Sequence, residues 1–307
     1  MKKVFPTKNY KEGDVIITED VTIPDCFYII NAGKVRITSN SGMPLLHDKA
    51  VLTAGEFFGI SSCLNSEKST TTAIAECEAT LLCVPKSDFP EFIAENLGLM
   101  NKILAYLSAR LRLLNDYLTS SSTQATKEEP FDMLYTNAEY YFGKSLNTQA
   151  FCSYKKYLKF APNGKYSEQA KEKLKKLEEF GKDIRFDYSE KELKRIYPAN
   201  SLIFSEKEPG TEMFVVQRGK INITKIVDGN EIVLAVLKHG DILGEMGLID
   251  QKPRSANAVA SEECEIMAIA RAIYLPLLKD GNVIIERICN TLAQRICSMH
   301  IKIKTEK

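Results

Sequence analysis

The sequence predicts an α+β protein: two antiparallel β-roll, jelly-roll-like domains with flanking helices, joined by an α-helical repeat-like module. Three observations predict this fold. Short segments of alternating apolar and polar residues, bounded by glycine-containing turns, fill both ends of the 307-residue chain. The two ends match each other at an offset of 185 or 186 residues. Between them, aromatic and alanine residues recur at helical spacing.

The last third of the chain carries the clearest strand pattern. Residues 213–217 are apolar except for Gln217, Gly219 interrupts the pattern, and residues 220–224 continue with period-two alternation, which predicts a hairpin. Asp228-Gly229 then predicts a two-residue turn into a further strand. Many short strands at this spacing are typical of a small antiparallel barrel or roll.

The first third of the chain repeats this pattern. Residues 28–37 match residues 214–223 in strand hydrophobicity, and the glycine that follows the first strand recurs as Gly33 and Gly219. Because both features recur at one offset, we expect two copies of one domain. They are called here the first copy and the second copy.

Each copy ends in an amphipathic helix. Apolar residues recur three and four apart in residues 104–118 and again in residues 285–303, which is the spacing of packed helix pairs. One small roll would not cover stripes this regular, so we expect helix-to-helix pairing. The pairing is either between the two copies of one chain or between two chains of a homodimer.

The middle of the chain resembles about one and a half tetratricopeptide repeats, a helical repeat family. Asn137 and Tyr157 depart from the common repeat pattern, so a plain helical hairpin with a third packing helix is the alternative. The matching positions are Leu134, Ala138, Tyr141, Ala150, Tyr154 and Pro162.

Two features mark the domain boundaries. Residues 119–123 are a polar run without helix or strand periodicity, and the helical pattern stops near Gly181. We therefore expect a first copy at residues 1–122, a helical module at 123–182 and a second copy at 183–307.

The most informative segment is residues 244–256, called here the cassette. It reads Gly-Glu-Met-Gly-Leu from Gly244 and Pro-Arg-Ser-Ala up to residue 256. Gly244 permits a sharp turn into a short helix near Glu245, whose N–H groups and dipole attract a phosphate. The planar fork of Arg254 matches phosphate oxygens, while Glu245 accepts from a hydroxyl. The alternative is a loop ion pair between these two residues, with the glycines serving only as turn residues.

On these residues the second copy resembles the cyclic nucleotide-binding domain family, which includes bacterial cAMP receptor proteins and regulatory subunits of cAMP-dependent protein kinase. The resemblance implies that Arg254 binds the cyclic phosphate and Glu245 the ribose hydroxyl. It also implies that the base lies near Met246, Val233 and the terminal helix around residues 297–300. The ligand expected is a cyclic nucleotide, cAMP rather than cGMP, although Ser255 is compatible with either. The expected binding residues are Gly244, Glu245, Met246, Gly247, Leu248, Arg254, Ser255 and Val233.

The first copy lacks the charged pair of the cassette. At the repeat offset, Gly59 corresponds to Gly244, but Ile60 replaces the acid and Ser69 replaces the arginine. We therefore expect a degenerate domain kept for its shape or as a docking surface. The alternative is an altered anionic ligand bound through Lys68, which lacks the bidentate geometry of arginine.

Composition argues against several classes of function. A formal charge of +1 gives no strong field for nucleic acid or an anionic membrane, and no run approaches the ~20 apolar residues of a membrane span. The start of the chain lacks the apolar core of a secretory signal. The eight cysteines are scattered, and we expect them to be reduced core residues of a cytoplasmic protein. Cys297 and His300 are too few ligands for a metal site, so no metal is expected.

No catalytic motif appears in the sequence, so we expect no enzyme activity. We expect a sensor or adaptor that binds ligand in the second copy and transmits it by helix rearrangement to a protein partner, through the helical module or the first copy. After Leu292 the pattern continues one helix, which argues against a DNA-reading helix-turn-helix. A regulator similar to kinase regulatory subunits and a ligand-free structural adaptor are the alternatives.

Overall fold

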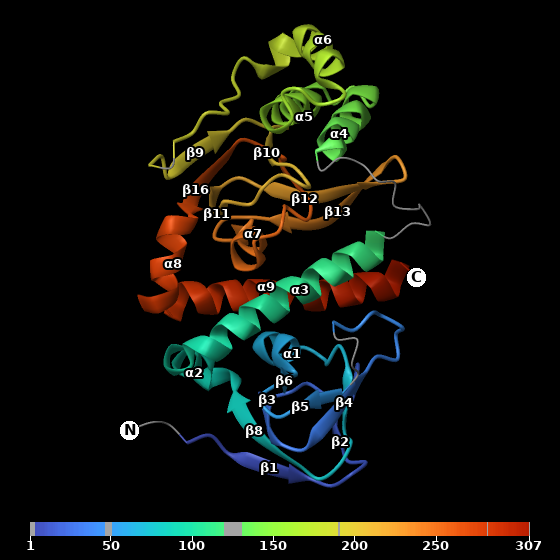
Figure 1. The fold of residues 1–307 in the computed structure, drawn as a ribbon, viewed down its shortest axis with the longest axis vertical. Helices are drawn as coiled ribbons and strands as arrows, with labels where there is room; N and C mark the ends of the chain where they lie inside the picture. The colour runs from blue at the N-terminus through green and yellow to red at the C-terminus, as the bar shows by residue number, and fades with distance from the viewer. Residues whose placement is uncertain (1–3, 47–50, 120–130, 190, 281, 307) are drawn as a thin grey trace. The chain divides into compact units, whose positions relative to one another are not determined.

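The structure is a computed structural model, and its described residues form two compact units (Figure 1). It describes residues 4–46, 51–119, 131–189, 191–280 and 282–306. Unit 1 contains the first copy and the C-terminal helix, within residues 1–118 and 276–307. Unit 2, within residues 119–275, contains the helical module and the second β-roll. The units cut across the expected boundaries, and the three-domain division stays a prediction.

The first copy is a roll of two four-stranded antiparallel sheets. One sheet has the order β1 (Thr7–Tyr10), β8 (Ala79–Pro85), β3 (Cys26–Ala32), β6 (Phe57–Phe58), and the other β2 (Val15–Ile17), β7 (Thr72–Ala75), β4 (Lys34–Thr38), β5 (Val51–Thr53). Apolar side chains from both sheets form the core, among them Ile17, Ile30, Val35 and Leu81. Burying these side chains is the main stabilising contribution of the roll.

The second copy repeats this topology strand for strand. One sheet has the order β14 (Ile242–Leu243), β11 (Glu212–Arg218), β16 (Cys264–Ala270), β9 (Lys194–Tyr197), and the other β10 (Leu202–Phe204), β15 (Asn257–Ala260), β12 (Ile221–Val227), β13 (Asn230–Leu237). The predicted turn between β12 and β13 is confirmed, because Asp228 and Gly229 both have positive φ, at 50° and 71°. Both copies are therefore antiparallel β-rolls, as the sequence predicts.

The predicted hairpin around Gly219 is wrong. In the described chain β11 pairs with β14 and β16, whereas β12 pairs with β13 and β15. At Gly219 the backbone turns from one sheet into the other with φ +88°, and a Cβ there would lie 2.5 Å from the carbonyl oxygen of Glu263. Gly33 is equivalent, with φ +86° and a Cβ position 2.4 Å from the oxygen of Glu78. The recurring glycine therefore marks a corner between sheets, where only glycine fits.

The helical module consists of α4 (Asp132–Gly143), α5 (Asn147–Phe160), α6 (Ser167–Leu177) and the 3₁₀ turn η2 (Glu178–Gly181). The predicted helical positions form its core, and Leu134, Ala138, Tyr141, Ala150 and Tyr154 are all fully buried. Three helices cannot enclose these residues alone. The same core cluster therefore includes Leu202 and Val259 of the second β-roll, which explains why the module and that roll form one unit.

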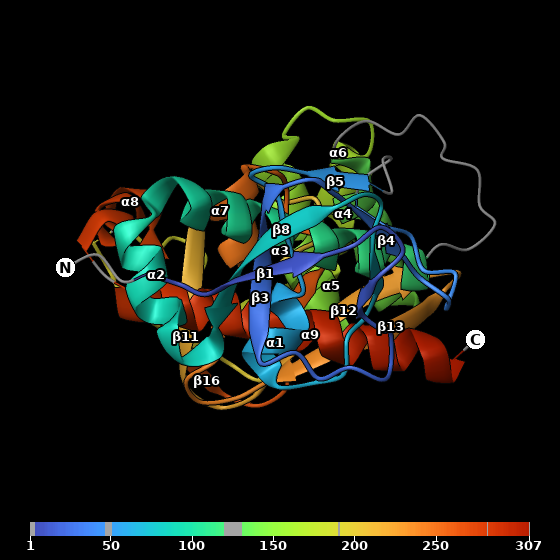
Figure 2. The same cartoon turned by 90° about the horizontal axis from the view of Figure 1, so that it is seen from below.

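Unit 1 carries the remaining helices of the first copy and the C-terminal helix. They are α1 (Ile60–Asn65), η1 (Lys86–Asp88), α2 (Phe89–Glu95), α3 (Leu97–Thr119) and α9 (Asn282–Glu306). α9 packs against α1 and α2 (Figure 2). Its apolar stripe is buried, as at Ile288, Leu292 and Ile296. The helix that follows the second copy in sequence thus docks on the first copy of the same chain.

Two short helices complete the chain: α7 (Glu245–Asp250) in the second copy, and α8 (Arg271–Asp280), which precedes α9. Among the described residues no helix is both long and apolar enough to cross a membrane. Seven of the eight cysteines are buried, and Cys77 is half-buried. The prediction that the cysteines are core residues is confirmed for those seven.

Candidate functional site

The cassette begins where β14 ends. Gly244 has φ +77° and caps the short helix α7, which starts at Glu245 as the sequence predicts. The side chain of Glu245 is inside the domain, with 1% of the residue exposed. Glu245 is therefore not a solvent-exposed loop acid, and burying its carboxylate is costly.

Arg254 is the second buried charge of the cassette, 5% exposed. Its Nη1 donates to the carbonyl oxygen of Gly244 and its Nη2 to that of Glu212, each at 2.7 Å. The guanidinium also lies over the ring of Phe204, 4.4 Å from the centroid. A Cβ on Gly244 would lie 2.5 Å from Nη1, so glycine is needed here both for its backbone conformation and for the approach of the arginine.

A second arginine contacts β11, the strand whose Glu212 carbonyl oxygen accepts from Arg254. No pattern in the sequence indicated this residue. Arg195 on β9 makes a bidentate ion pair with Glu212 at 2.7 and 2.6 Å. Burial opposes the charge of Arg195, but its hydrogen bonds to Glu212 raise its pKa above the usual value. The ring of Phe214 lies 5.8 Å from both guanidinium groups. No spacing signal links these residues, because β9 and β11 are brought together only through β16.

The loop before β11 is tied to the cassette through its backbone. The N–H of Lys207 donates to the oxygen of Arg254 at 2.9 Å, and the N–H of Arg254 donates to the oxygen of Glu208 at 2.8 Å. Gly210 packs against Gly247, since a Cβ on Gly210 would be 2.9 Å from the Cα of Gly247. The second cassette glycine therefore permits the close approach of this loop.

The remaining predicted residues occupy two environments. Met246 and Leu248 are buried on α7. Ser255 is half-buried, and its hydroxyl lies 4.0 Å from the sulfur of Met246. Val233 lies on β13 and is 41% exposed. The structure thus groups Gly244, Gly247 and Arg254 at one end of α7, and Met246 with Ser255.

The first copy keeps the backbone of the cassette and lacks its charges. Gly59 has φ +79° and caps α1, which has six residues as α7 has. At the positions of the acid and the arginine, Ile60 and Ser69 are both buried, and the Ser69 hydroxyl donates to the oxygen of Thr71. Ile60 therefore offers no acceptor for a hydroxyl group, and Ser69 offers no positive charge for a phosphate.

The C-terminal helix meets the first copy at α1. The Cys297 thiol donates to the oxygen of Ser61 at 3.7 Å, and the Asn65 amide donates to the Cys297 sulfur at 3.6 Å. Burial raises the pKa of Cys297 to about 11, so the thiol stays protonated near neutral pH. These contacts dock residues 297–300 on the first copy. A contact of the same residues with the base of a ligand in the second copy stays a prediction.

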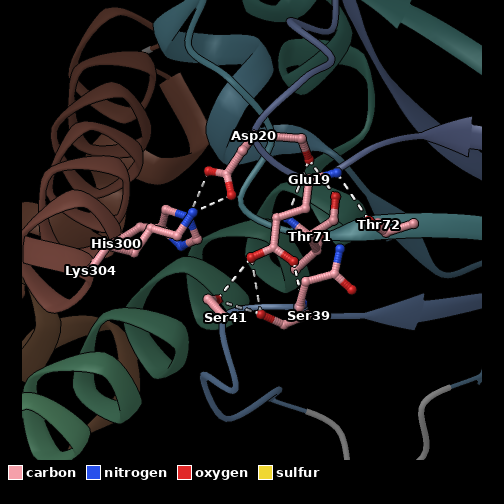
Figure 3. Close-up of polar contacts among 10 residues, drawn as sticks. Glu19, Asp20, Ser39, Ser41, Thr71, Thr72, His300 and Lys304 are labelled. Carbon is pink, nitrogen blue, oxygen red and sulfur yellow. Dashed lines mark hydrogen bonds and ion pairs between the residues drawn. The ribbon is translucent and has the colours of Figure 1, made fainter. Parts of the chain in front are cut away.

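His300 and Lys304 extend this contact to Asp20 (Figure 3). The Asp20 carboxylate faces the ring of His300, at 3.3 Å from Nε2, and also receives Lys304. Behind it, Glu19 accepts hydrogen bonds from the hydroxyls of Ser39 and Ser41. Glu19, Asp20 and His300 lie close enough to share a metal ion. Lys304 and the two serines already occupy both carboxylates, so the contact is a latch between helix and roll.

The comparison with protein families decides the assignment. The model of the cyclic nucleotide-binding domain matches residues 7–96 and 194–280, together more than half of the chain. The chain belongs to this family. The match covers most of both copies, so the first copy belongs to the family although its charged pair is absent. The resemblance seen in the cassette is thereby confirmed.

Similar proteins include both kinds of regulator. The cyclic AMP receptor protein of Thermus thermophilus is 33% identical over 37% of this chain and 52% of its own length. A cAMP-dependent protein kinase regulatory subunit of Aspergillus niger is 34% identical over 27% of this chain and 20% of its own. The chain therefore spans about half or less of these relatives.

Solved structures give the same two groups. The catabolite activator protein of Thermus thermophilus is 32% identical over 37% of this chain and 54% of its own, with a TM-score of 0.34. A cAMP-bound PfPKA-R structure is 19% identical over 99% of this chain and 80% of its own, with a TM-score of 0.29. TM-scores this low support no statement about domain arrangement.

Proposed function

We propose that the protein is a cyclic nucleotide sensor whose ligand binds in the second copy, with cAMP preferred to cGMP. Arg254 binds the cyclic phosphate and Glu245 accepts a hydrogen bond from the ribose hydroxyl. The observation that carries the proposal is that both charges are buried within one cassette, while the equivalent residues of the first copy are Ile60 and Ser69.

The geometry supports a phosphate at this place. The guanidinium is held by two carbonyl oxygens and by the ring of Phe204, so its plane is fixed before any ligand arrives. Fixing a binding group in advance reduces the entropy lost on binding. Water is largely excluded at 5% exposure, which strengthens the attraction between guanidinium and phosphate.

The signal passes along the chain to the first copy. The second β-roll continues from β16 directly into α8 and then α9, and α9 is docked on α1 through Cys297 and on Asp20 through His300. A ligand that favours one position of the cassette shifts the balance between docked and released α9 in proportion to its differential affinity. The first copy or the helical module then presents the change to a protein partner in the cytoplasm.

Calorimetric titration of the purified chain with cAMP and with cGMP tests the proposal. We expect one site per chain and tighter binding of cAMP. Two equal sites per chain would contradict the assignment to the second copy alone, and tighter binding of cGMP would contradict the base preference. Hydrogen exchange at the α9 amides, measured with and without ligand, tests the transmission. Unchanged exchange at saturating ligand would refute it.

A ligand-free structural adaptor is the second candidate. One observation favours it, namely that the α1 surface of the first copy is already covered by α9 of the same chain. A flat titration with both cyclic nucleotides would select this function.

A further inference from the structure

A cavity lies in unit 2, lined in part by the loop before β11 that packs on the cassette. Its volume is about 470 Å³, which is within the range of small-molecule sites. Four segments line it, namely the residue before α4, the loop before β11, the segment after α7 and the start of α8. Its lining residues are Phe131, Lys207, Pro209, Gly210, Thr211, Gln251, Lys252, Pro253 and Arg271.

The charged side chains that line this cavity have one sign. Lys207, Lys252 and Arg271 come from three different segments, and no aspartate or glutamate is among the described lining residues. The chain as a whole carries a formal charge of only +1. Three cations around one hollow therefore create a local positive field.

Backbone hydrogen bonds hold these three segments in place. Lys207 and Arg254 are joined N–H to oxygen at 2.9 Å, and the N–H of Arg271 donates to the oxygen of Thr211 at 3.3 Å. Lys207 and Gln251 have φ values of 68° and 55°, a left-handed conformation that costs energy for residues other than glycine. The cavity is thus formed before a ligand binds.

The equivalent loop of the first copy contacts a charged side chain. Asp20 has φ +60° and donates its N–H to the oxygen of Ser69, just as Lys207 does to Arg254. The carboxylate of Asp20 receives the basic side chain of Lys304 from α9. At the equivalent position the second copy carries Lys207, so a negatively charged group is expected to bind there.

We propose that this cavity is a second ligand site, for a nucleoside polyphosphate. The three cations receive the phosphate chain, whose several negative charges match them. Phe131 offers a ring for the base, and that ring is held by stacking on Phe160 with centroids 5.6 Å apart. The backbone of Gly210 separates this site from the cassette arginine, since a Cβ there would lie 3.4 Å from the Arg254 Nη1.

Titration of ATP, without magnesium, into the full chain tests the proposal. We expect saturable binding at one site per chain, and the same binding in the presence of excess cAMP. The double variant Lys207→Ala/Lys252→Ala should weaken ATP binding by about ten-fold or more, because two cations near the phosphates are lost. Both lysines are exposed, so the fold should be retained.

The matched control is Lys171→Ala/Lys175→Ala, which removes two exposed lysines of α6 and should leave ATP affinity unchanged. The proposal is overturned if ATP shows no saturable binding, if both double variants lose affinity equally, or if cAMP displaces ATP. Failure of cAMP to bind leaves the ATP result intact, so the two proposals fail separately.

Discussion

Replacing Arg254 by alanine is the sharpest perturbation of the cassette. The substitution removes a guanidinium that is 5% exposed, donates to the carbonyl oxygens of Gly244 and Glu212, and lies over Phe204. It also leaves a bound phosphate without the guanidinium that donates to it. Affinity for cAMP should therefore fall, and part of the domain stability should fall with it.

The size of the effect follows from burial. A guanidinium and a phosphate about 4 Å apart attract by roughly 4 kcal/mol at the effective dielectric of a protein surface, against about 1 kcal/mol in water. If a phosphate oxygen replaces a backbone carbonyl as the acceptor of an Arg254 hydrogen bond, the lost bond reduces this attraction by about 1 kcal/mol. A net loss of about 2–4 kcal/mol remains, which is about thirty-fold or more in the dissociation constant.

Titration calorimetry with cAMP measures this loss, and melting temperature reports the accompanying change in stability. Arg254→Lys keeps the charge without the planar fork and should fall between the wild type and Arg254→Ala. The control is Arg218→Ala, since that side chain is 64% exposed and pairs with Glu263 on the surface. Equal cAMP affinity for the wild type and Arg254→Ala would refute the role of the guanidinium, whatever the melting temperatures.

Three further predictions concern single positions. Glu245→Gln should cost less affinity than loss of the cassette arginine and should reduce the preference for cAMP over its 2′-deoxy analogue by about ten-fold; an unchanged preference would count against the ribose contact. Gly244→Ala should lower both stability and cAMP affinity, because its Cβ meets the Arg254 guanidinium. The control is Gly229→Ala, where φ is also positive but the surrounding space is open. It should lower only the free energy of unfolding measured with denaturant, by about 1 kcal/mol. Burial lowers the pKa of His300, although Asp20 opposes this shift. The folded state therefore favours the neutral ring. The stability that this preference contributes is present above about pH 6.5 and is lost as pH falls through the folded pKa. His300→Gln should flatten the fall in melting temperature between about pH 7 and pH 5, and an equal fall in the variant would exclude the latch as its source.

Local chemistry made much of the fold predictable. Asp228-Gly229 determines a tight turn through positive φ, and Gly244 determines the start of a short helix, so both features could be placed from sequence alone. The helical module could be predicted from the helical spacing of the residues between Leu134 and Tyr154, and the structure buries those residues. The error at Gly219 has a physical reason. Alternation identifies a strand, but it does not say which strand is its neighbour, and the same glycine serves a hairpin or a corner between sheets.

The features that were missed depend on residues far apart in the chain. Arg195 reaches Glu212 only because β16 lies between their strands. His300 and Asp20 are 280 positions apart, and the apolar stripe of α9 reveals that the helix is covered without revealing what covers it. Charge pairs of this kind carry no periodic signal, so they become visible only when the tertiary structure is known.

The central claim is that the second copy alone holds a cyclic nucleotide. The most direct measurement is a crystal structure of the chain grown with excess cAMP. We expect one ligand per chain, with its phosphate against Arg254 and its ribose against Glu245. Ligand density beside Gly59 of the first copy, with or without ligand in the second copy, would contradict this claim.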